Sequence, residues 1–169
     1  MSTLAQTLNA ACTAQAIVDT PLGRVRLART ATGLAGLWFE GQKHHPGELA
    51  APHRPDDPLL REAARQLQRY FDGALARFEL PLDLQGTPFQ RSVWTALLGV
   101  PRGRTCSYGE LARAIGAPAA VRAVGAAVGR NPASLVVPCH RVLGRGGTLT
   151  GYAGGLARKR ALLALEARA

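Results

Sequence analysis

A change in character near residue 85 limits the folds that are open to this chain. Residues 1–85 carry nine Lys/Arg and nine Asp/Glu, so this half is electrically neutral. Residues 86–169 carry twelve Lys/Arg and only two acids, Glu110 and Glu166, so the whole net charge of +10 lies in the second half. We therefore expect two domains, residues 1–85 and 86–169, and a phosphate-rich partner for the second.

The first half has the pattern of a small sheet followed by one helix. Short, mainly apolar segments are separated by the turn signals Pro21-Leu22-Gly23 and Thr32-Gly33, which predicts an antiparallel sheet of three strands at 16–18, 25–27 and 34–39. Residues 41–58 are rich in Gly, Pro and His and indicate a surface loop. Asp57 is placed to cap a helix over 58–71, and residues 80–86 are expected to form a linker.

The second half has the pattern of short capped helices. We expect helices at residues 88–98, 108–115, 119–128 and 156–167. Thr87 and Ser107 are the predicted caps of the first two, and Glu110 completes a capping box with Ser107. Four glycines within 142–152 favour a β-hairpin there. The expected fold class is α+β: an N-terminal three-stranded antiparallel sheet with a helix, then a mainly helical winged helix-turn-helix domain.

Two of these helices, at 108–115 and 119–128, are joined by the tight break Gly116-Ala117, as in a helix-turn-helix. In the second helix nearly all side chains are small, and only Arg122 and Arg130 reach far from the backbone. Such a helix offers little base readout, so it suits sequence-independent contact with the DNA minor groove and the insertion of one arginine. The alternative is a small-residue face that packs against another helix.

Cys139 lies between the apolar run 135–137 and the pair His140 and Arg141. A neighbouring base or cation lowers the pKa of a thiol and makes it nucleophilic. The alternative is that this cysteine is a small buried hydrophobe.

Cys12 and Cys106 have no paired spacing, which favours a reducing, intracellular setting over a disulfide framework. With no secretory signal and no apolar run of membrane-spanning length, we expect a cytoplasmic protein that does not contact membranes.

Several motifs occur together in the second half and resemble those of the O6-alkylguanine-DNA alkyltransferases. They are Gly86-Thr87-Pro88-Phe89-Gln90, Ser107-Tyr108-Gly109-Glu110-Leu111-Ala112, Arg122-Ala123-Val124-Gly125, Asn131-Pro132, Pro138-Cys139-His140-Arg141-Val142 and Gly151-Tyr152-Ala153-Gly154-Gly155-Leu156. The resemblance covers residues 86–166. The first half resembles the family more loosely, through Thr20-Pro21-Leu22-Gly23.

The resemblance implies direct reversal of DNA damage by a suicide enzyme without a cofactor. The alkyl group of O6-alkylguanine, and of O4-alkylthymine as well, would pass irreversibly to Cys139 after the base is flipped out of the duplex. His140 and Glu166 would form the relay that deprotonates the thiol. Asn131 would brace the recognition helix against the active-site segment, and Tyr108 would help to rotate the nucleotide.

The resemblance also assigns residues that touch DNA and the substrate. Arg122 would fill the gap left in the base stack, and Ala123 and Gly125 would lie on the helix face in the minor groove of double-stranded DNA. The implied substrate pocket comprises Val128, Ser134, Val142, Tyr152, Ala153, Gly154 and Lys159. Ala153 stands where some members have serine, so its contact with O6 would come from the backbone N–H. Ser134 replaces a proline of some members, and this replacement would widen the range of accepted alkyl groups. We expect a monomer in solution that can cluster cooperatively on DNA.

Three other interpretations are weighed against this one. Some relatives hold zinc, but Cys12 has no cysteine partner nearby and His44, His45 and His53 lack ligand spacing, so we expect no metal. A non-catalytic binder of damaged DNA would lack the acceptor cysteine. A transcriptional regulator would need a base-reading helix and a dimerisation element, and the sequence shows neither.

Overall fold

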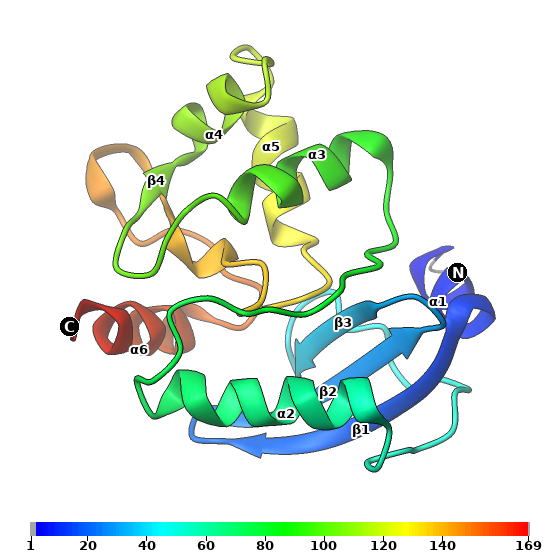
Figure 1. The fold of residues 1–169 in the computed structure, drawn as a ribbon. Coiled ribbons are helices and arrows are strands. Elements are labelled where there is room, and N and C mark those ends of the chain that lie inside the picture. The colour runs from blue at the N-terminus through cyan, green and yellow to red at the C-terminus, as the bar shows by residue number, and fades with distance from the viewer. Residues whose placement is uncertain (1–2, 169) are drawn as a thin grey trace.

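The computed structural model describes residues 3–168 and places a small sheet with its helices below a mainly helical region (Figure 1). The lower part holds α1 (Thr3–Ala11), β1 (Cys12–Thr20), β2 (Gly23–Thr30), β3 (Leu34–Phe39) and α2 (Pro58–Phe71). The upper part holds α3 (Pro88–Leu97), β4 (Cys106–Ser107), α4 (Tyr108–Ala114), α5 (Val121–Gly129), the 3-10 turn η1 (Cys139–Arg141), β5 (Val142–Leu143) and the 3-10 turn η2 (Arg145–Gly147). Helix α6 (Leu156–Ala167) completes the described chain. Within residues 3–168, no helix is long and apolar enough to cross a membrane.

The predicted three-stranded antiparallel sheet is confirmed, in the order β1–β2–β3. Thr20 pairs with Gly23, so only Pro21 and Leu22 turn the chain between the first two strands. Gly23 has φ +120°, a conformation that residues with a side chain rarely adopt, so this position favours glycine. The α+β class expected from the sequence is thus present.

Helix α1 was not among the predicted elements, and it covers the face of the sheet opposite α2. Leu8 is fully buried against Ala28, Ala35 and Trp38 of the sheet and Leu49 of the following loop. The other face of β3 packs toward α2 and the upper part. Because β3 is buried on both faces, all six of its residues are apolar or small, as expected for a central layer.

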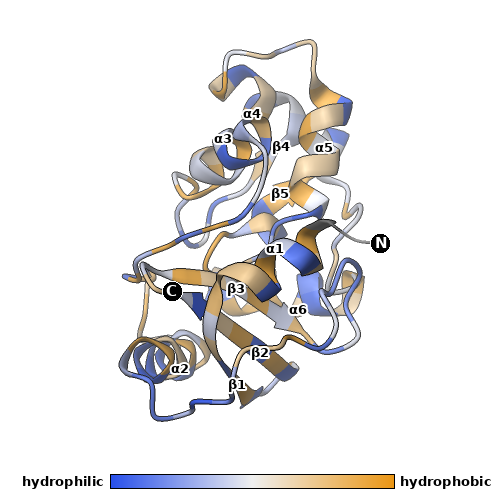
Figure 2. Ribbon diagram, turned by 90° about the vertical axis from the view of Figure 1, so that its right-hand side faces the viewer, coloured by the Kyte–Doolittle hydropathy of each residue, from blue (hydrophilic) through white to orange (hydrophobic). Residues whose placement is uncertain are grey.

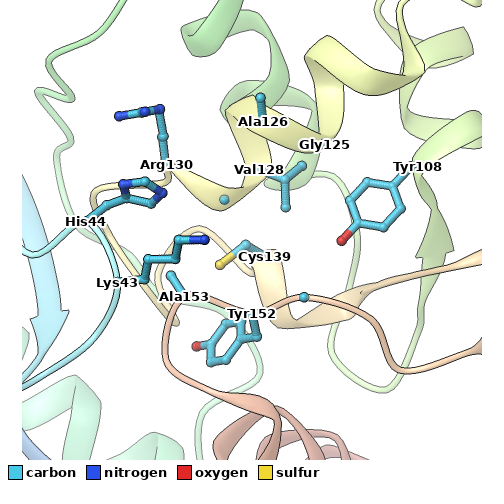
Figure 3. Close-up of a pocket in the computed structure, with 12 residues that line it drawn as sticks. Lys43, His44, Tyr108, Gly125, Ala126, Val128, Arg130, Cys139, Tyr152 and Ala153 are labelled. Atoms are coloured by element: carbon cyan, nitrogen blue, oxygen red, sulfur yellow. The ribbon is translucent and has the colours of Figure 1, made fainter.

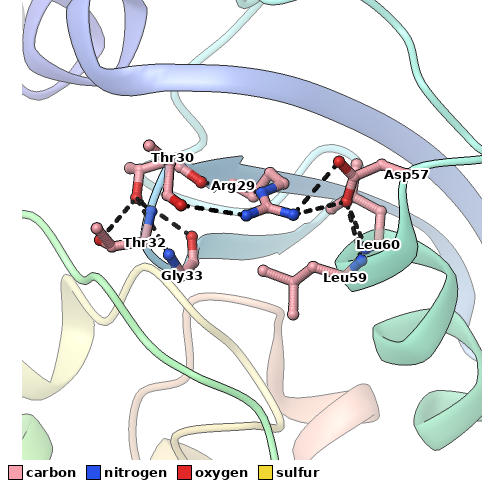
Figure 4. Close-up of polar contacts among 8 residues, drawn as sticks. Arg29, Thr30, Thr32, Gly33, Asp57, Leu59 and Leu60 are labelled. Atoms are coloured by element: carbon pink, nitrogen blue, oxygen red, sulfur yellow. Dashed lines mark hydrogen bonds and ion pairs between the residues drawn. The ribbon is translucent and has the colours of Figure 1, made fainter.

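Helix α2 is tied to the sheet by its own cap (Figure 4). As predicted, Asp57 is the N-cap, and its Oδ1 accepts hydrogen bonds from the N–H groups of Leu59 and Leu60 at 3.0 and 3.1 Å. The same oxygen accepts from Arg29 of β2 at 3.0 Å. One carboxylate therefore caps the positive N-terminal end of the helix and anchors the helix to a strand.

The two parts of the molecule meet along β3. The N–H of Leu37 donates to Pro132 O at 2.8 Å, and the N–H of Ser134 donates to Leu37 O at 2.9 Å. Leu34 makes a similar bridge to Leu82 of the predicted linker. One hydrophobic cluster runs through both parts, and Figure 2 shows hydrophobic residues along the sheet, α5 and β5. The backbone that leads into the Cys139 segment is therefore held by a strand of the first half.

The helices of the second half follow their predicted caps. Thr87 with Gln90 and Ser107 with Glu110 form capping boxes at the starts of α3 and α4. Helix α5 begins at Val121, two residues later than predicted, because the N–H of Ala120 closes a turn onto Ala117 O.

The β-hairpin predicted within 142–152 is wrong. Strand β5 instead pairs in parallel with β4, and residues 145–147 form the turn η2. Gly146 and Gly147 have φ values of +70° and +82°, which turn the chain sharply. Two backbone hydrogen bonds close the turn, from Gly144 N–H to Thr148 O and from Gly147 N–H to Gly144 O. The glycines therefore make a compact loop in place of a second strand.

Candidate active site

A cavity of about 380 Å³ lies beside α5 and the start of η1. Figure 3 shows the sulfur of Cys139 facing it, with Tyr108 on one side and Lys43 and His44 on the other. Six residues predicted for the site line it: Tyr108, Gly125, Val128, Cys139, Tyr152 and Ala153. Cys139 is only 4% exposed, yet it borders an open space and is not enclosed by packed side chains.

The backbone around Asn131 fixes the approach to Cys139. The amide Nδ2 of Asn131 donates to Val137 O at 2.8 Å, and its Oδ1 accepts from Ala133 N–H at 3.0 Å. Leu135, between these contacts, is fully buried with φ +73°, a strained conformation for a residue with a side chain. The bonds to Asn131 and β3 hold that turn in place.

Residues 139–141 form a 3-10 turn, and this lets Cys139 face a different surface from His140 and Arg141. A 3-10 helix has about three residues per turn, so successive side chains point about 120° apart. Cys139 faces the cavity, while His140 and Arg141 face the interior toward Glu166 of α6.

His140 and Glu166 form a buried pair. The ring Nε2 of His140 lies 2.7 Å from Oε1 of Glu166, and His140 is fully buried. Its other ring nitrogen, Nδ1, is buried without a hydrogen-bond partner among the described residues. Burial lowers the pKa of His140, and the hydrogen bond to Glu166 opposes this shift. The imidazole is therefore neutral near pH 7, with Nε2 engaged and Nδ1 able to accept a proton.

Arg141 grips the same carboxylate with two bonds. Its Nε lies 2.9 Å from Oε2 of Glu166 and its Nη2 lies 2.8 Å from Oε1, while Nη1 donates to Val100 O at 2.6 Å. Although burial acts to raise it, hydrogen bonds from His140 and Arg141 hold the pKa of Glu166 well below its ordinary value. Glu166 is therefore a permanent anion inside the protein.

The expected lowering of the pKa of Cys139 is not found in the free protein. Burial raises the pKa of this thiol to about 11, although the Asn131 amide and the Lys159 charge act in the opposite direction. Arg141 does not lower it, because its guanidinium is committed to Glu166. The thiol is thus protonated at rest, and a base must remove its proton when it reacts.

Lys159, which the resemblance assigns to the substrate pocket, does not line the cavity wall. Lys159 is fully buried, and its Nζ donates to the carbonyls of Val142, Thr150 and Gly151 at 2.6, 2.9 and 3.1 Å. Three carbonyl oxygens replace water around the ammonium group, which makes its burial tolerable. The contact fixes the start of the loop that lines the cavity. Its position in a run of three basic residues hid this role in the sequence.

The remaining predicted residues lie outside the cavity wall. Arg122 and Ala123 are exposed on α5, and Gly154 is buried next to the wall residue Ala153. Ser134 is 1% exposed, and its hydroxyl lies 3.4 Å from Oε1 of Gln42. The carbonyl of Val142 already accepts from Lys159. The functional roles of these residues stay predictions.

Lys43, His44 and Arg130 line the cavity and were missed as site residues. The first two belong to the loop after β3, and the N–H of Lys43 donates to Ala153 O at 2.9 Å. Nothing in the sequence connects residue 43 with residue 153. Only the short run Lys43-His44-His45 offered a signal, and it did not single out a cavity. Among residues 3–168, no group of three or more His, Cys, Asp or Glu side chains is placed to hold a metal ion.

Comparison with known proteins identifies the family. Residues 14–84 match the family model described as 6-O-methylguanine DNA methyltransferase, ribonuclease-like domain, and residues 88–168 match the DNA binding domain of the same methyltransferase. The chain belongs to this methyltransferase family. It is 50% identical over 149 residues to a methylated-DNA–protein-cysteine methyltransferase of Mycobacterium tuberculosis, covering 88% of this chain and 89% of that protein. An inducible methyltransferase of that name from Bacillus subtilis is 43% identical over 153 residues, 90% of this chain and 84% of the relative.

Solved structures of methyltransferases agree with this assignment. The crystal structure of Mycobacterium tuberculosis OGT in complex with DNA has a TM-score of 0.83 and 47% identity, covering 91% of this chain and 92% of that one. The O6-methylguanine-DNA methyltransferase of Pyrococcus kodakaraensis, 24% identical with a TM-score of 0.54 over 90% of this chain and 98% of that one, shares the fold. The chain is therefore a methylated-DNA–protein-cysteine methyltransferase, an enzyme that binds DNA and repairs it by alkyl transfer.

Proposed function

We propose that this methyltransferase moves the alkyl group of O6-alkylguanine, and of O4-alkylthymine as well, irreversibly to Sγ of its own Cys139. The observation that carries the proposal is the position of Cys139 on the wall of a cavity of about 380 Å³. The next residue, His140, is buried and lies within hydrogen-bond distance of Glu166. Binding pockets for small organic groups begin at about 300 Å³, so a single nucleobase is a suitable occupant.

The proposed reaction starts from the neutral thiol. Its proton passes through a water molecule to Nδ1 of His140, and the Glu166 carboxylate stabilises the imidazolium that forms. The thiolate then attacks the alkyl carbon, the carbon–oxygen bond breaks, and its electron pair stays on the guanine. No metal or organic cofactor takes part. Because the resulting thioether does not hydrolyse, each molecule reacts once.

The guanine leaves with negative charge that nearby donors can stabilise. Tyr108 and the backbone N–H of Ala153, both on the cavity wall, are the proposed donors. The carbonyls of Cys139 and Val142 are proposed to accept from the guanine amine. Each already accepts one bond, from Val142 N–H and Lys159 respectively, and a carbonyl oxygen has a second lone pair.

The proposed DNA-binding surface is the exposed face of α5, which carries Arg122, Ala123 and Ala126. Its small side chains allow a close approach to the minor groove without sequence preference, and Arg122 fills the place of the flipped base. Flipping costs a few kcal/mol, less where the lesion already weakens the base pair. The same proposal includes three further points. The protein is a monomer that can cluster on DNA, its domains meet between residues 85 and 86, and it is located in the cytoplasm.

The test is a single-turnover reaction with duplex DNA that carries one O6-methylguanine. Intact-protein and peptide mass spectrometry should find one methyl group per molecule, on Cys139. Cys139→Ser should gain none, whereas Cys12→Ser, which changes a half-buried cysteine outside the cavity wall, should react as the unchanged protein does. Methylation of another residue, or several turnovers per molecule, would refute the proposal.

A further inference from the structure

Tyr70 of α2 reaches across the molecule to the carboxylate that holds His140. It is 1% exposed, and its hydroxyl donates to Oε1 of Glu166 at 2.7 Å. The same oxygen lies 2.7 Å from Nε2 of His140. Tyr70 belongs to the first half of the chain, 96 residues away from Glu166, and α2 lies below α6 (Figure 1). The neutral half therefore touches the relay directly.

Building on the function proposed above, we propose that Tyr70 is a positioning residue for alkyl transfer, whose hydroxyl holds the Glu166 carboxylate in the orientation that presents Oε1 to His140. Oε1 is the acceptor for Tyr70, His140 and Nη2 of Arg141, and Oε2 is the acceptor for Nε of Arg141. With donors on both oxygens and from two elements, the carboxylate cannot rotate without breaking several buried bonds.

Packing alone explains the ring of Tyr70 but not its hydroxyl. The ring contacts Phe71 and Phe78, with centroids 5.2 and 5.5 Å away, and the guanidinium of Arg102 lies 4.8 Å from its centroid. A phenylalanine would fill the same space without the cost of burying a polar group. Burial is also the main reason that the pKa of Tyr70 is raised, so the hydroxyl keeps its proton at every working pH. The hydroxyl is therefore a permanent donor to Glu166.

The charges around His140 and Glu166 give the direction in which the pKa of His140 changes when the Tyr70 hydroxyl is removed. Glu166 is faced by His140, Arg141 and Tyr70, and the other charged groups that act on His140 and Tyr70 are Lys159 and Arg102. The Tyr70 hydroxyl partly neutralises the negative charge on Oε1. Without it, the carboxylate stabilises the imidazolium more strongly, so the pKa of His140 rises. As the pH falls, His140 then becomes protonated at a higher pH than in the unchanged protein, and a protonated imidazole cannot accept the thiol proton.

The test is Tyr70→Phe, which keeps the ring and removes only the hydroxyl. Single-turnover methyl transfer is measured between pH 5 and pH 9, and the pKa of His140 is followed by NMR. We expect the acid limb of the rate profile and the pKa of His140 to move upward together, by about half a pH unit or more. The control Phe78→Leu loosens the packing around the ring and keeps the hydroxyl. It should lower thermal stability and leave the acid limb where it is.

Two outcomes overturn the inference: an unchanged pKa of His140 in Tyr70→Phe, or an equal shift in Phe78→Leu. The NMR titration gives this answer even if the variant transfers methyl groups slowly. Failure of the inference is separable from failure of the proposed function, because the unchanged protein is assayed first for methylation of Cys139. If Cys139 is methylated and the titration is unchanged, only the role of Tyr70 is refuted.

Discussion

The two halves of the molecule contribute to one site in different ways. The second half holds the entire net charge, the thiol and the His140–Glu166 pair. The neutral first half supplies the backbone of β3, which holds the segment before Cys139, together with Tyr70, which donates to Glu166, and Lys43 at the cavity. The reacting groups are thus close in sequence, whereas the contacts that fix their geometry come from far away.

The charge of each half agrees with this difference. DNA attracts cations over a broad surface, so the half that docks benefits from a uniform excess of Lys/Arg. The first half contacts Glu166 through a neutral group, the hydroxyl of Tyr70, and adds no further cation beside His140 and Arg141. Variants in each half therefore test this division of roles.

The largest expected effect is in the second half, at Glu166→Gln. The change removes the anion that stabilises the His140 imidazolium and leaves Arg141 buried without its partner. We expect the methyl-transfer rate to fall by about 10²- to 10⁴-fold. The free energy of unfolding should fall by about 3–5 kcal/mol. Single-turnover kinetics and urea denaturation measure the two losses.

The matched control for this variant is Glu110→Gln. It changes the other acid of the second half, an exposed residue whose capping bond to Ser107 N–H glutamine can replace. It should leave both rate and stability close to their original values. A rate for Glu166→Gln within a few-fold of the unchanged protein would contradict the relay.

The next effect separates docking from chemistry within the second half. Arg122→Ala should slow repair of duplex DNA by about tenfold or more, since the flipped state loses the side chain that fills the stack. Reaction with a free O6-alkylguanine base should be unchanged. Arg113→Ala removes another exposed arginine, from α4, and should have a smaller effect on duplex repair. Equal losses of Arg122→Ala on both substrates would remove Arg122 from the flipping role.

A third expectation concerns acid pH. The pKa of Glu166 is held below its ordinary value, so its contribution to stability is present above about pH 4.5 and is lost as pH falls. The pKa of His140 is lowered by burial, so the unfolded chain binds a proton below about pH 6.5 that the folded chain does not. Both groups therefore lower the free energy of unfolding as the pH falls. Urea denaturation should show stability falling by about 1–3 kcal/mol from pH 7 to pH 4, and a rise would contradict the assignment.

The smallest expected effect is in the first half, at Lys43→Ala. Lys43 is exposed and lines the cavity, so its removal should weaken DNA binding only a few-fold and reduce the salt dependence of binding by about one counterion. Arg61→Ala, which removes an exposed cation from α2, should change neither. An identical salt dependence for the two variants would show that the first half does not reach the DNA.

Local signals predicted much of the fold and the reactive centre. The caps Asp57, Thr87 and Ser107 placed three helices correctly, because a cap acts on hydrogen bonds within a few residues of itself. The apolar runs and the turn signals between them placed the three strands, because strands and tight turns also depend on residues close together in sequence. The order of the family motifs indicated Cys139, His140 and Glu166, and the structure brings the last two together at 2.7 Å.

Features that depend on distant contacts could not be predicted from the sequence. The burial of Lys159 depends on three carbonyls that only the folded loop assembles, and the hydroxyl of Tyr70 meets Glu166 only when α2 and α6 pack on the same core. The four glycines of 142–152 fit a hairpin as well as a compact loop until β5 pairs with β4. The raised pKa of Cys139 is likewise a consequence of burial that motif spacing does not reveal.

A crystal structure of Cys139→Ser bound to duplex DNA with one O6-methylguanine would show whether a flipped base reaches residue 139. We expect the damaged base in the cavity between Tyr108, Gly125 and Tyr152, with its methyl group toward residue 139 and Arg122 in the base stack. An O6-methylguanine that stays stacked in the duplex, with the cavity free of the base, would rule out alkyl transfer from a flipped base to Cys139.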